Sequence, residues 1–519
     1  MLSPLIWIPT IGAIVLALLP QSVNGARVRQ VAMGFMAAAF AWSLVVLTQF
    51  DVHNPGIQLV ENIDWLKDLG LTYSLGIDGL SILLVVLNAL LMIVAVQCSD
   101  VGLSRPRFYY ALLMLINTGV AGAFVSQNML LFFLFYELEL IPLYLLIGIW
   151  GGARRGYAAT KFLIYTAVSG ILILASFLGL VWLSGTGSFD YNATMAADLP
   201  MKLQLLLLAG FVIGFGIKIP LFPFHTWLPD AHVEASTPVS ILLAGVLLKL
   251  GTYGLLRFAM GLFPEAWSLV APYLAWWAVV SVLFGTFSAI AQTDMKKMVA
   301  YSSVGHMGFV LLASAASTSL SLVGTVFQMV SHGLISGLLF VLVGVVYKKT
   351  KTRDINVLRG LFCPERGLPI IGSLMVLGVM ASAGLPGMVG FVSEFLIFRG
   401  SFSPFPAQTL LCMVGTGLTA VYFLLLVNKT FFGRLPKEFG NLPSVNWPEH
   451  LPGFVLAGLI VIFGLQPTLL VRWIENSSVT MMASFPQQPH KVPEGATIYP
   501  QFEPTASDQA LVAPEIAPS

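Results

Sequence analysis

The chain has 519 residues, of which 57% are hydrophobic and only 10% are charged. Soluble domains carry about a quarter charged residues, so this composition excludes a soluble protein and indicates one that crosses a membrane many times. The formal net charge of +2 gives no basis for nucleic-acid binding. The three cysteines have neither the spacing of a zinc site nor that of a disulfide framework. No cleavable signal sequence is expected, because the first basic residue, Arg27, follows the first apolar segment.

Apolar segments of about 20 residues, the length of a membrane-spanning helix, follow one another along the chain. About fourteen are expected, near residues 3–20, 29–50, 76–97, 108–126, 129–150, 160–184, 203–222, 237–260, 271–291, 296–315, 320–346, 368–398, 407–432 and 452–474. The fold class is therefore an all-α polytopic membrane protein. From about Glu475 to Ser519 proline is frequent and apolar periodicity is lost. This tail is expected to be extended, disordered or held by a partner.

The connections between these segments differ in charge. When they are numbered alternately, seventeen lysines and arginines, Lys296 among them, lie on one side and six, Arg257 among them, on the other. The positive-inside rule then assigns the basic side to the cytoplasm. Both termini are predicted on the outer side, in the periplasm or a lumen, and the number of spans is predicted to be even.

Charged residues also occur inside the apolar segments: Glu137, Glu139, Lys218, Lys249 and Glu394. A charge at mid-bilayer is costly unless it is paired or hydrated, so such residues normally mark an ion or proton route. A lysine near a helix end can extend to the interface, but Lys249 is about twelve residues from either end. Glu137 and Glu139 are two residues apart and point to nearly opposite faces, so only one is expected to face the interior.

Four histidines lie in or beside the same segments. His306 and His332 fit a proton path, but a hydrogen-bonded structural role is about as well supported for each. His225 and His232 fit either the cytoplasmic mouth of a path or a cap on an interrupted helix. The residue pattern leaves both interpretations open for all four.

Two of the predicted segments carry helix breakers. Residues 203–232 would form a helix about 45 Å long, and Pro220 and Pro223 interrupt it. Pro386, with its neighbouring glycines, repeats the pattern in the twelfth segment, close to Glu394. A broken helix is tolerated in a membrane where it lines a protein cavity. Because the broken helices are the seventh and the twelfth, an odd distance apart, they predict two inverted five-helix repeats, helices 4–8 and 9–13, in which the paired broken helices mark the transport site.

This organisation divides the chain into five parts. They are an N-terminal group of three helices over 1–107, the repeats over 108–260 and 261–432, a last helix over 433–474, and the tail over 475–519.

Six separated motifs resemble, in order, the antiporter-like subunits of respiratory complex I. They are ELELIPLYLLIGIWGG (137–152), KIPLFPFHTWLPDAH (218–232), the helix around Lys249, AYSSVGHMGFV (300–310), MVSHGL (329–334) and GLPGMVGFVSEF (384–395). The likeness covers almost the whole chain except the tail. It is greatest to the chain 4 type, because Glu394 stands where sister subunits carry lysine and no long lateral helix follows the fourteenth segment. The details resemble cyanobacterial members, including the chain 4 variant of complexes that drive carbon dioxide uptake.

The resemblance implies roles for individual residues. Glu137 would pair with Lys218, Lys249 would be the central lysine, and Glu394 would lie on the outlet half-channel. His306 and His332 would lie along a hydrated axis. Glu139 departs from some relatives and receives no role.

The resemblance also implies a proton-translocating subunit of an NAD(P)H-quinone oxidoreductase in which electrons travel elsewhere. The chain has no P-loop, dinucleotide fingerprint or cluster-binding cysteine set, so no cofactor is expected in it. Quinone or plastoquinone and an electron donor, NAD(P)H or ferredoxin, would be used by other subunits. The expected partners are the other membrane-arm subunits, including sister antiporter-like subunits, and lipids. The expected location is a cyanobacterial thylakoid membrane.

Other functions fit parts of the pattern. An Mrp-type cation/proton antiporter subunit and a membrane hydrogenase subunit would share the same helices and lysines. A haem-bearing membrane cytochrome would instead use His306 and His332 as axial ligands.

Overall fold

The computed structural model describes residues 1–485 apart from 101, 366, 441 and 484. The elements of the first half are α1 (Ser3–Leu18), α2 (Gly25–Gln49), β1 (Gln58–Leu66), η1 (Lys67–Leu69), β2 (Leu71–Ile77), α3 (Ile82–Cys98), α4 (Pro106–Val125), α5 (Met129–Leu138), α6 (Leu140–Trp150), α7 (Arg155–Ser184), α8 (Met201–Lys218), η2 (Phe224–Thr226), α9 (Trp227–Glu234), α10 (Thr237–Leu242), η3 (Leu243–Leu247), α11 (Leu248–Gly254) and η4 (Leu255–Met260).

In the described residues of the second half every element is helical. Its elements are α12 (Pro264–Ile290), α13 (Met295–Ala316), α14 (Ser319–Thr350), α15 (Pro369–Ser382), α16 (Val389–Phe402), α17 (Pro406–Phe431), η5 (Lys437–Phe439), α18 (Trp447–Leu465) and α19 (Thr468–Ala483). Within the described residues, eleven helical stretches are long and apolar enough to cross a membrane, and the shorter apolar helices α1, α3 and α15 accompany them. The prediction of an all-α polytopic membrane protein is confirmed.

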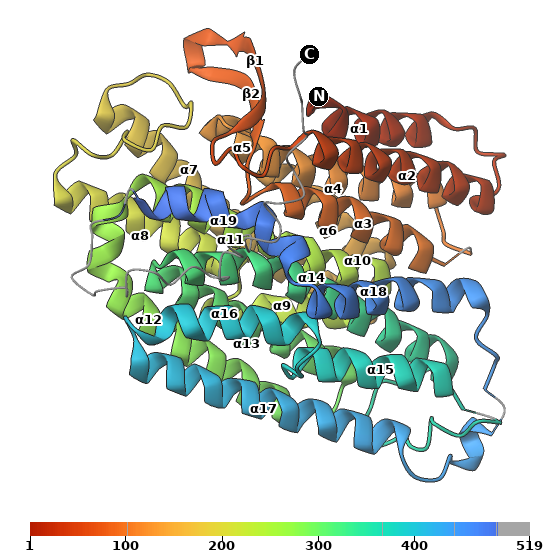
Figure 1. Ribbon diagram of the computed structural model, residues 1–519. Coiled ribbons are helices and arrows are strands. Elements are labelled where there is room, and N and C mark those ends of the chain that lie inside the picture. The colour runs from red at the N-terminus through yellow and green to blue at the C-terminus, as the bar shows by residue number, and fades with distance from the viewer. Residues whose placement is uncertain (101, 366, 441, 484, 486–519) are drawn as a thin grey trace, which may run out of the picture. The chain divides into compact units, whose positions relative to one another are not determined.

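Four helical stretches are almost entirely buried and form the centre of the bundle. They are α4, the continuous stretch from α10 to η4, α13 and α14. Figure 1 shows α14 near the middle, with α1 and α2 at one border and α17 at the other. The outer helices α2, α7, α12 and α17 expose large apolar side chains, which suits contact with lipid or with a neighbouring membrane subunit.

Side-chain caps fix where several helices begin. Asn128 accepts hydrogen bonds from the Leu130 and Leu131 N–H groups at the start of α5. Asp294 does the same for two N–H groups at the start of α13, and Thr318 forms a capping box on α14. These side chains satisfy backbone donors that the helix itself leaves unpaired.

The helical path is interrupted at both predicted places. α8 ends at Lys218, and the chain resumes as a helix only at η2 and α9. The Trp227 indole N–H donates to the Ile217 carbonyl (2.9 Å), and the Phe222 N–H donates to the Ser281 hydroxyl (3.1 Å). Backbone groups freed by the break therefore find partners inside the protein, as a membrane interior requires.

The second interruption separates α15 from α16 and uses glycine for a steric reason. Gly384 and Gly387 have φ angles of +74° and +89°, a region that side chains rarely adopt. A Cβ on Gly384 would lie 3.0 Å from the Glu394 carboxylate. The turn therefore brings the backbone directly against this acid.

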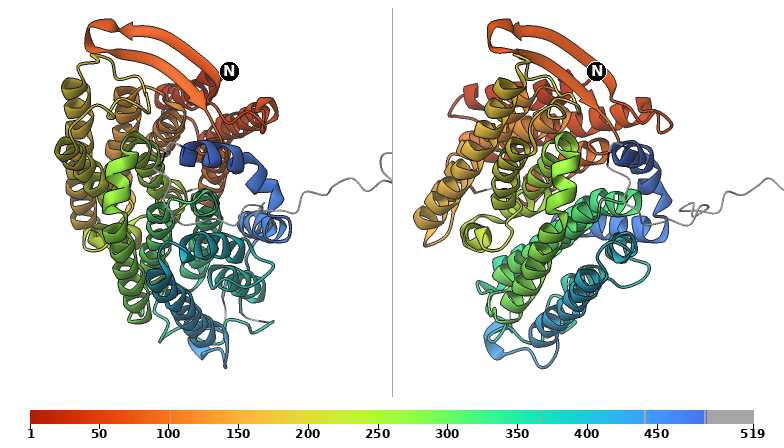
Figure 2. Two further views of the ribbon diagram at one scale, coloured as in Figure 1. Left: turned by 60° about the vertical axis from the view of Figure 1, so that its left-hand side comes forward. Right: turned by 90° about the vertical axis from the view of Figure 1, so that its left-hand side faces the viewer.

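Two elements were not predicted. The connection between the second and third segments holds the antiparallel hairpin β1–β2, which projects from the helices as a curved ribbon (Figure 2). The predicted fourteenth segment ends early at Leu465, and Pro467 separates it from α19. The expectation of an extended tail from residue 475 was therefore wrong as far as Ala483, because residues 475–483 belong to α19. Residues 486–519 of that predicted tail lie outside the described part of the chain.

The two ends of the bundle allow a test of orientation. The connection after α14 exposes Lys351 and Arg359, whereas the hairpin turn at the opposite end exposes Lys67. Because basic connections face the cytoplasm, trypsin added from the cytoplasmic side should cut between α14 and α15 and leave Lys67 intact. Trypsin sealed on the other side should cut at Lys67. Mass spectrometry of the fragments from oriented vesicles measures both, and the reverse pattern would contradict the assignment.

Candidate functional site

The first part of the site is a buried ion pair between the broken helix α8 and the junction of α5 with α6. Lys218, the last residue of α8, donates to the Glu139 carboxylate, and both side chains are almost fully buried. Glu139 occupies the single-residue gap between α5 and α6, where the helix is locally irregular ahead of Pro142. The Tyr136 ring lies beneath the lysine, with its centroid 4.7 Å from Nζ. The charge is thus compensated by one carboxylate and one aromatic face.

This pairing corrects the expectation that Glu137 would hold Lys218. The Glu137 carboxylate lies against Gly170 of α7, where a Cβ would come within 2.3 Å of its oxygen. It remains close enough to interact electrostatically with Lys218 and Glu139, although it makes no contact ion pair among the described residues. The two glutamates do face different ways, as predicted. The irregular turn at Glu139 gives this residue, rather than Glu137, the interior position.

The central lysine lies in a helix with unusual hydrogen bonding. The π-helical segments η3 and η4 lie on either side of α11, which carries Lys249. The Lys249 side chain is fully buried. Its Nζ donates to the Ala244 carbonyl of η3 and lies 2.7 Å from Nδ1 of His332 on α14. Short π segments inside α-helices occur frequently at functional sites.

From His332 the buried groups continue toward the second helix break. The His332 and His306 ring centroids are 5.6 Å apart. His306 Nδ1 lies 2.8 Å from the Ser302 carbonyl, and its Nε2 lies 3.3 Å from the Ser382 carbonyl at the end of α15. The same Nε2 is 3.9 Å from Oε1 of Glu394 on α16.

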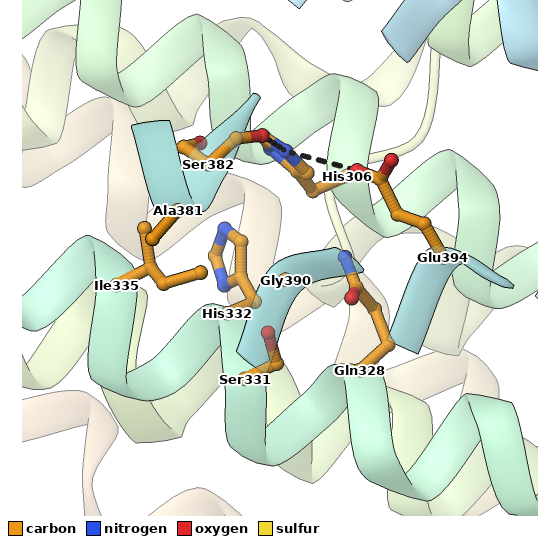
Figure 3. A pocket seen from close by; sticks show the side chains of 9 residues that line it. All are labelled: His306, Gln328, Ser331, His332, Ile335, Ala381, Ser382, Gly390 and Glu394. Atoms are coloured by element: carbon orange, nitrogen blue, oxygen red, sulfur yellow. Dashed lines mark hydrogen bonds and ion pairs between the residues drawn. The ribbon is translucent and has the colours of Figure 1, made fainter. Parts of the chain in front are cut away.

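Glu394 is held by Thr416 and faces a small cavity. The Thr416 hydroxyl donates to Oε2 of Glu394 (2.9 Å). The cavity is lined by both histidines, Gln328, Ser331, Ile335, Ala381, Ser382, Gly390 and Glu394 (Figure 3). Its volume suffices for about one water molecule. Lys249, His332, His306 and Glu394 therefore form a continuous series of buried titratable groups, called here the axial chain.

The other two histidines lie in η2 and α9, after the break that ends α8. The His225 ring, in η2, packs on Phe222 and Phe284 with centroid separations of 5.7 and 4.8 Å. His232, in α9, is fully buried and stacks on Phe340 of α14 with a centroid separation of 4.5 Å. Neither ring nitrogen of His232 has a hydrogen-bond partner in the described part of the chain. The predicted breakers Pro220 and Pro223 lie in the turn before η2, and Pro386 lies in the turn before α16.

Sequence reasoning missed two buried cations because it counted them as loop charges. Arg257 was assigned to an outer connection but lies in η4, where its guanidinium pairs with Asp78 and stacks near Tyr253 and Tyr191 (5.5 Å each). Lys296 was assigned to a cytoplasmic connection but lies in the first turn of α13, with 5% of its surface exposed. A lysine or arginine near the boundary of a predicted helix can lie either in the connection or in the buried end of the helix, and its position near the boundary is the signal for considering both.

Comparison with known proteins places this arrangement in a family. The family model described as "NADH:quinone oxidoreductase/Mrp antiporter, TM" matches residues 126–419. A relative named NAD(P)H-quinone oxidoreductase chain 4 2, from Microcystis aeruginosa, is 44% identical over 441 residues, which cover 83% of this chain and 79% of the relative. A relative named NAD(P)H-quinone oxidoreductase chain 4-2, from Synechocystis, is 43% identical over 99% of this chain and 97% of the relative.

Two solved structures have the same fold. A chain of respiratory complex I from Thermus thermophilus with bound NADH matches with a TM-score of 0.84 and 27% identity, over 93% of this chain and 99% of that one. A chain of the Mrp complex from Dietzia matches with a TM-score of 0.83 over 93% of this chain and 97% of that one, but at 18% identity. With the family model covering its buried charged centre, the chain belongs to the family of NADH:quinone oxidoreductase and Mrp antiporter transmembrane subunits.

Proposed function

We propose that this chain translocates protons as the chain 4 subunit in the membrane arm of an NAD(P)H-quinone oxidoreductase of complex I type. Relatives named as that chain are 43–44% identical to it over most of its length. The observation that carries the proposal is the axial chain, in which a buried lysine, two histidines and a glutamate follow one another across the bundle. Such groups are costly in a membrane and are retained where they conduct ions or protons.

The axial chain has the chemistry that stepwise proton transfer needs. An ammonium on Lys249 donates to His332 Nδ1. The imidazole can therefore take up a proton from Lys249 at Nδ1 and release another from Nε2. His306 has a carbonyl oxygen near each ring nitrogen, and these two oxygens would accept both N–H bonds of a protonated ring. The water-sized cavity beside both rings opens on Glu394, which accepts the proton last.

The Glu139–Lys218 pair supplies the electrostatic control. Two unit charges 4 Å apart interact by about 4 kcal/mol at an effective dielectric constant of about 20. Moving one charge against 100 mV requires about 2.3 kcal/mol. Separating or reforming this pair therefore changes the energy of nearby protons by enough to drive transfer against a membrane potential.

The remaining parts of the proposal concern the assembly. Electron transfer from NAD(P)H or ferredoxin to quinone would take place in other subunits. Sister antiporter-like subunits and lipid would cover the exposed apolar helices, and a thylakoid membrane would be the site. The carbon-dioxide-uptake variant stays a prediction from sequence likeness, and the proteins that co-purify in mild detergent would test it.

Two alternatives receive less support. The Mrp likeness extends to the fold but reaches only 18% identity, so an antiporter that works outside an oxidoreductase is the second candidate. A haem between His306 and His332 would need far more space than the cavity they line, which has room for about one water molecule.

The first prediction from the site concerns Lys249. If this residue relays protons, Lys249→Met should leave the complex assembled but reduce proton pumping by at least about 100-fold, the low end of the range for loss of a proton-transfer group. Lys249→Arg should fail as well, because a guanidinium stays protonated. Proton uptake by membrane vesicles and a blue-native gel measure pumping and assembly. An assembled Lys249→Met complex with normal pumping would show that the lysine is structural.

The second prediction concerns the partner of Lys218. Glu139→Gln leaves a buried ammonium unpaired, a change that typically costs about 3–5 kcal/mol, whereas Glu137→Gln leaves the contact pair intact. Glu139→Gln should therefore lower the temperature at which the complex disassembles, and adding Lys218→Met should restore much of the loss. The matched cycle with Glu137→Gln should show much weaker coupling to Lys218. Stronger coupling of Lys218 to Glu137 in heated samples on blue-native gels would reverse the assignment.

A further inference from the structure

A third buried lysine, Lys296, lies outside the axial chain at the cytoplasmic end of α13. Its side-chain nitrogen donates to the Ala235 carbonyl at the end of α9 (2.6 Å). Only 5% of the Lys296 surface is exposed. In the described ranges no carboxylate lies within ion-pair distance of its side-chain nitrogen. A buried ammonium that has only a carbonyl as contact partner is costly, so its retention needs an explanation.

Three charged groups lie near Lys296. They are Arg353, Asp294 and Glu234. The Asp294 carboxylate caps α13 through the N–H groups of Lys296 and Lys297, and it pairs with Arg353 (3.2 Å). Arg353 and Asp294 remain partly exposed, with 21% and 28% of their side chains accessible. This pair is therefore accessible to solvent at the start of α13, where Lys296 lies.

His232 lies in α9, one turn before Ala235, the residue whose carbonyl accepts the hydrogen bond from Lys296. Its ring is fully buried and stacks on Phe340 of α14, the helix that also carries His332, the contact partner of Lys249. Neither ring nitrogen has a hydrogen-bond partner among the described residues. Buried polar atoms without protein partners are commonly satisfied by ordered water. A buried ring with two unmatched nitrogens suits a group that receives a proton on one nitrogen and releases one from the other. One buried lysine binds the end of the ring's own helix, and the helix on which the ring stacks contacts a second.

We propose that Lys296 loads protons from the cytoplasmic side onto His232 and through it onto Lys249, so that Lys249 has a supply that does not pass through Lys218. An N–H bond of the Lys296 ammonium breaks, and the proton passes through water to one nitrogen of His232. The proton on the other nitrogen passes through water to the Lys249 amine. Lys296 is reprotonated by water entering beside the Arg353–Asp294 pair. The proposal rests on the proposed function of the axial chain.

A purely structural role makes a different prediction. The end of α9 is already bound by a second cation, because Arg353 donates to the Val233 carbonyl (2.9 Å). If Lys296 merely adds another cation to this helix end, arginine should replace it, since it keeps the charge and can reach a carbonyl. If Lys296 transfers protons, arginine should fail, because it does not release its proton.

The experiment compares Lys296→Arg and Lys296→Met with the same two changes at Lys297, the adjacent lysine, which is only partly buried. Pumping by vesicles, quinone reduction and assembly are measured for each. We expect Lys296→Arg to assemble and to lose pumping by at least about 100-fold, while both Lys297 variants stay near wild type. Combining Lys296→Arg with His232→Gln should lower pumping no further than the worse single change, because the two groups act in series.

The Lys249→Met variant, measured in parallel, separates the two hypotheses. Normal pumping by an assembled Lys249→Met complex would contradict the proposed function of the axial chain itself. Loss of pumping in Lys249→Met with normal pumping in an assembled Lys296→Arg or Lys296→Met complex would overturn only the role of Lys296. Failure of both Lys296 variants to assemble would identify the lysine as a structural cap and would also overturn it.

Discussion

The structure depends on the cost of placing an ammonium group in a fully buried helix. Lys249 lies where no lipid headgroup or bulk water can reach it, and its contact partners are one carbonyl and one imidazole. Neither cancels a full charge, so the lysine is tolerable only if its proton can leave or if neighbouring groups share it. His332, His306 and Glu394 provide those neighbours in sequence. The helices that carry them form the centre of the bundle, and the apolar helices around them exclude solvent and lipid.

Helix breaks follow from the same constraint. Continuous helices bury every interior carbonyl in their own hydrogen bonds and leave nothing polar for a proton path. At α8 and at the α15–α16 junction the chain stops being helical, and a titratable group stands next to each stop: Lys218 at one and Glu394 at the other. The freed backbone groups are satisfied by Trp227, Ser281 and His306. Polar structure therefore occurs in the membrane interior where the protein itself completes its hydrogen bonding.

The sequence predicted much of this because burial of charge and helix breaking are local signals. Lys249, His306, His332 and Glu394 were selected individually, and the structure brings them into one line. The partner of Lys218 could not be predicted, since a single irregular residue at Glu139 rotates one glutamate inward and the other toward α7.

Residues at helix boundaries and in the connections were harder to assign. Lys296 and Arg257 sit at helix ends, where a charge count cannot tell a loop from the first or last buried turn. The β1–β2 hairpin was missed because its nine-residue first strand is mostly exposed and carries no continuous apolar pattern.

The two π-helical segments beside Lys249 determine the direction in which that side chain points. A π turn accommodates one more residue than an α turn, and one residue corresponds to about 100° around a regular helix. With η3 directly before it, α11 is set out of angular register with α10, although both belong to one buried stretch. Lys249 thus points toward His332 because the π-helical turn rotates the side-chain direction, which a regular α-helix would set differently at this position. The second π-helical segment, η4, changes the side-chain direction again at the end of the same stretch. Arg257, which lies in η4, pairs there with Asp78.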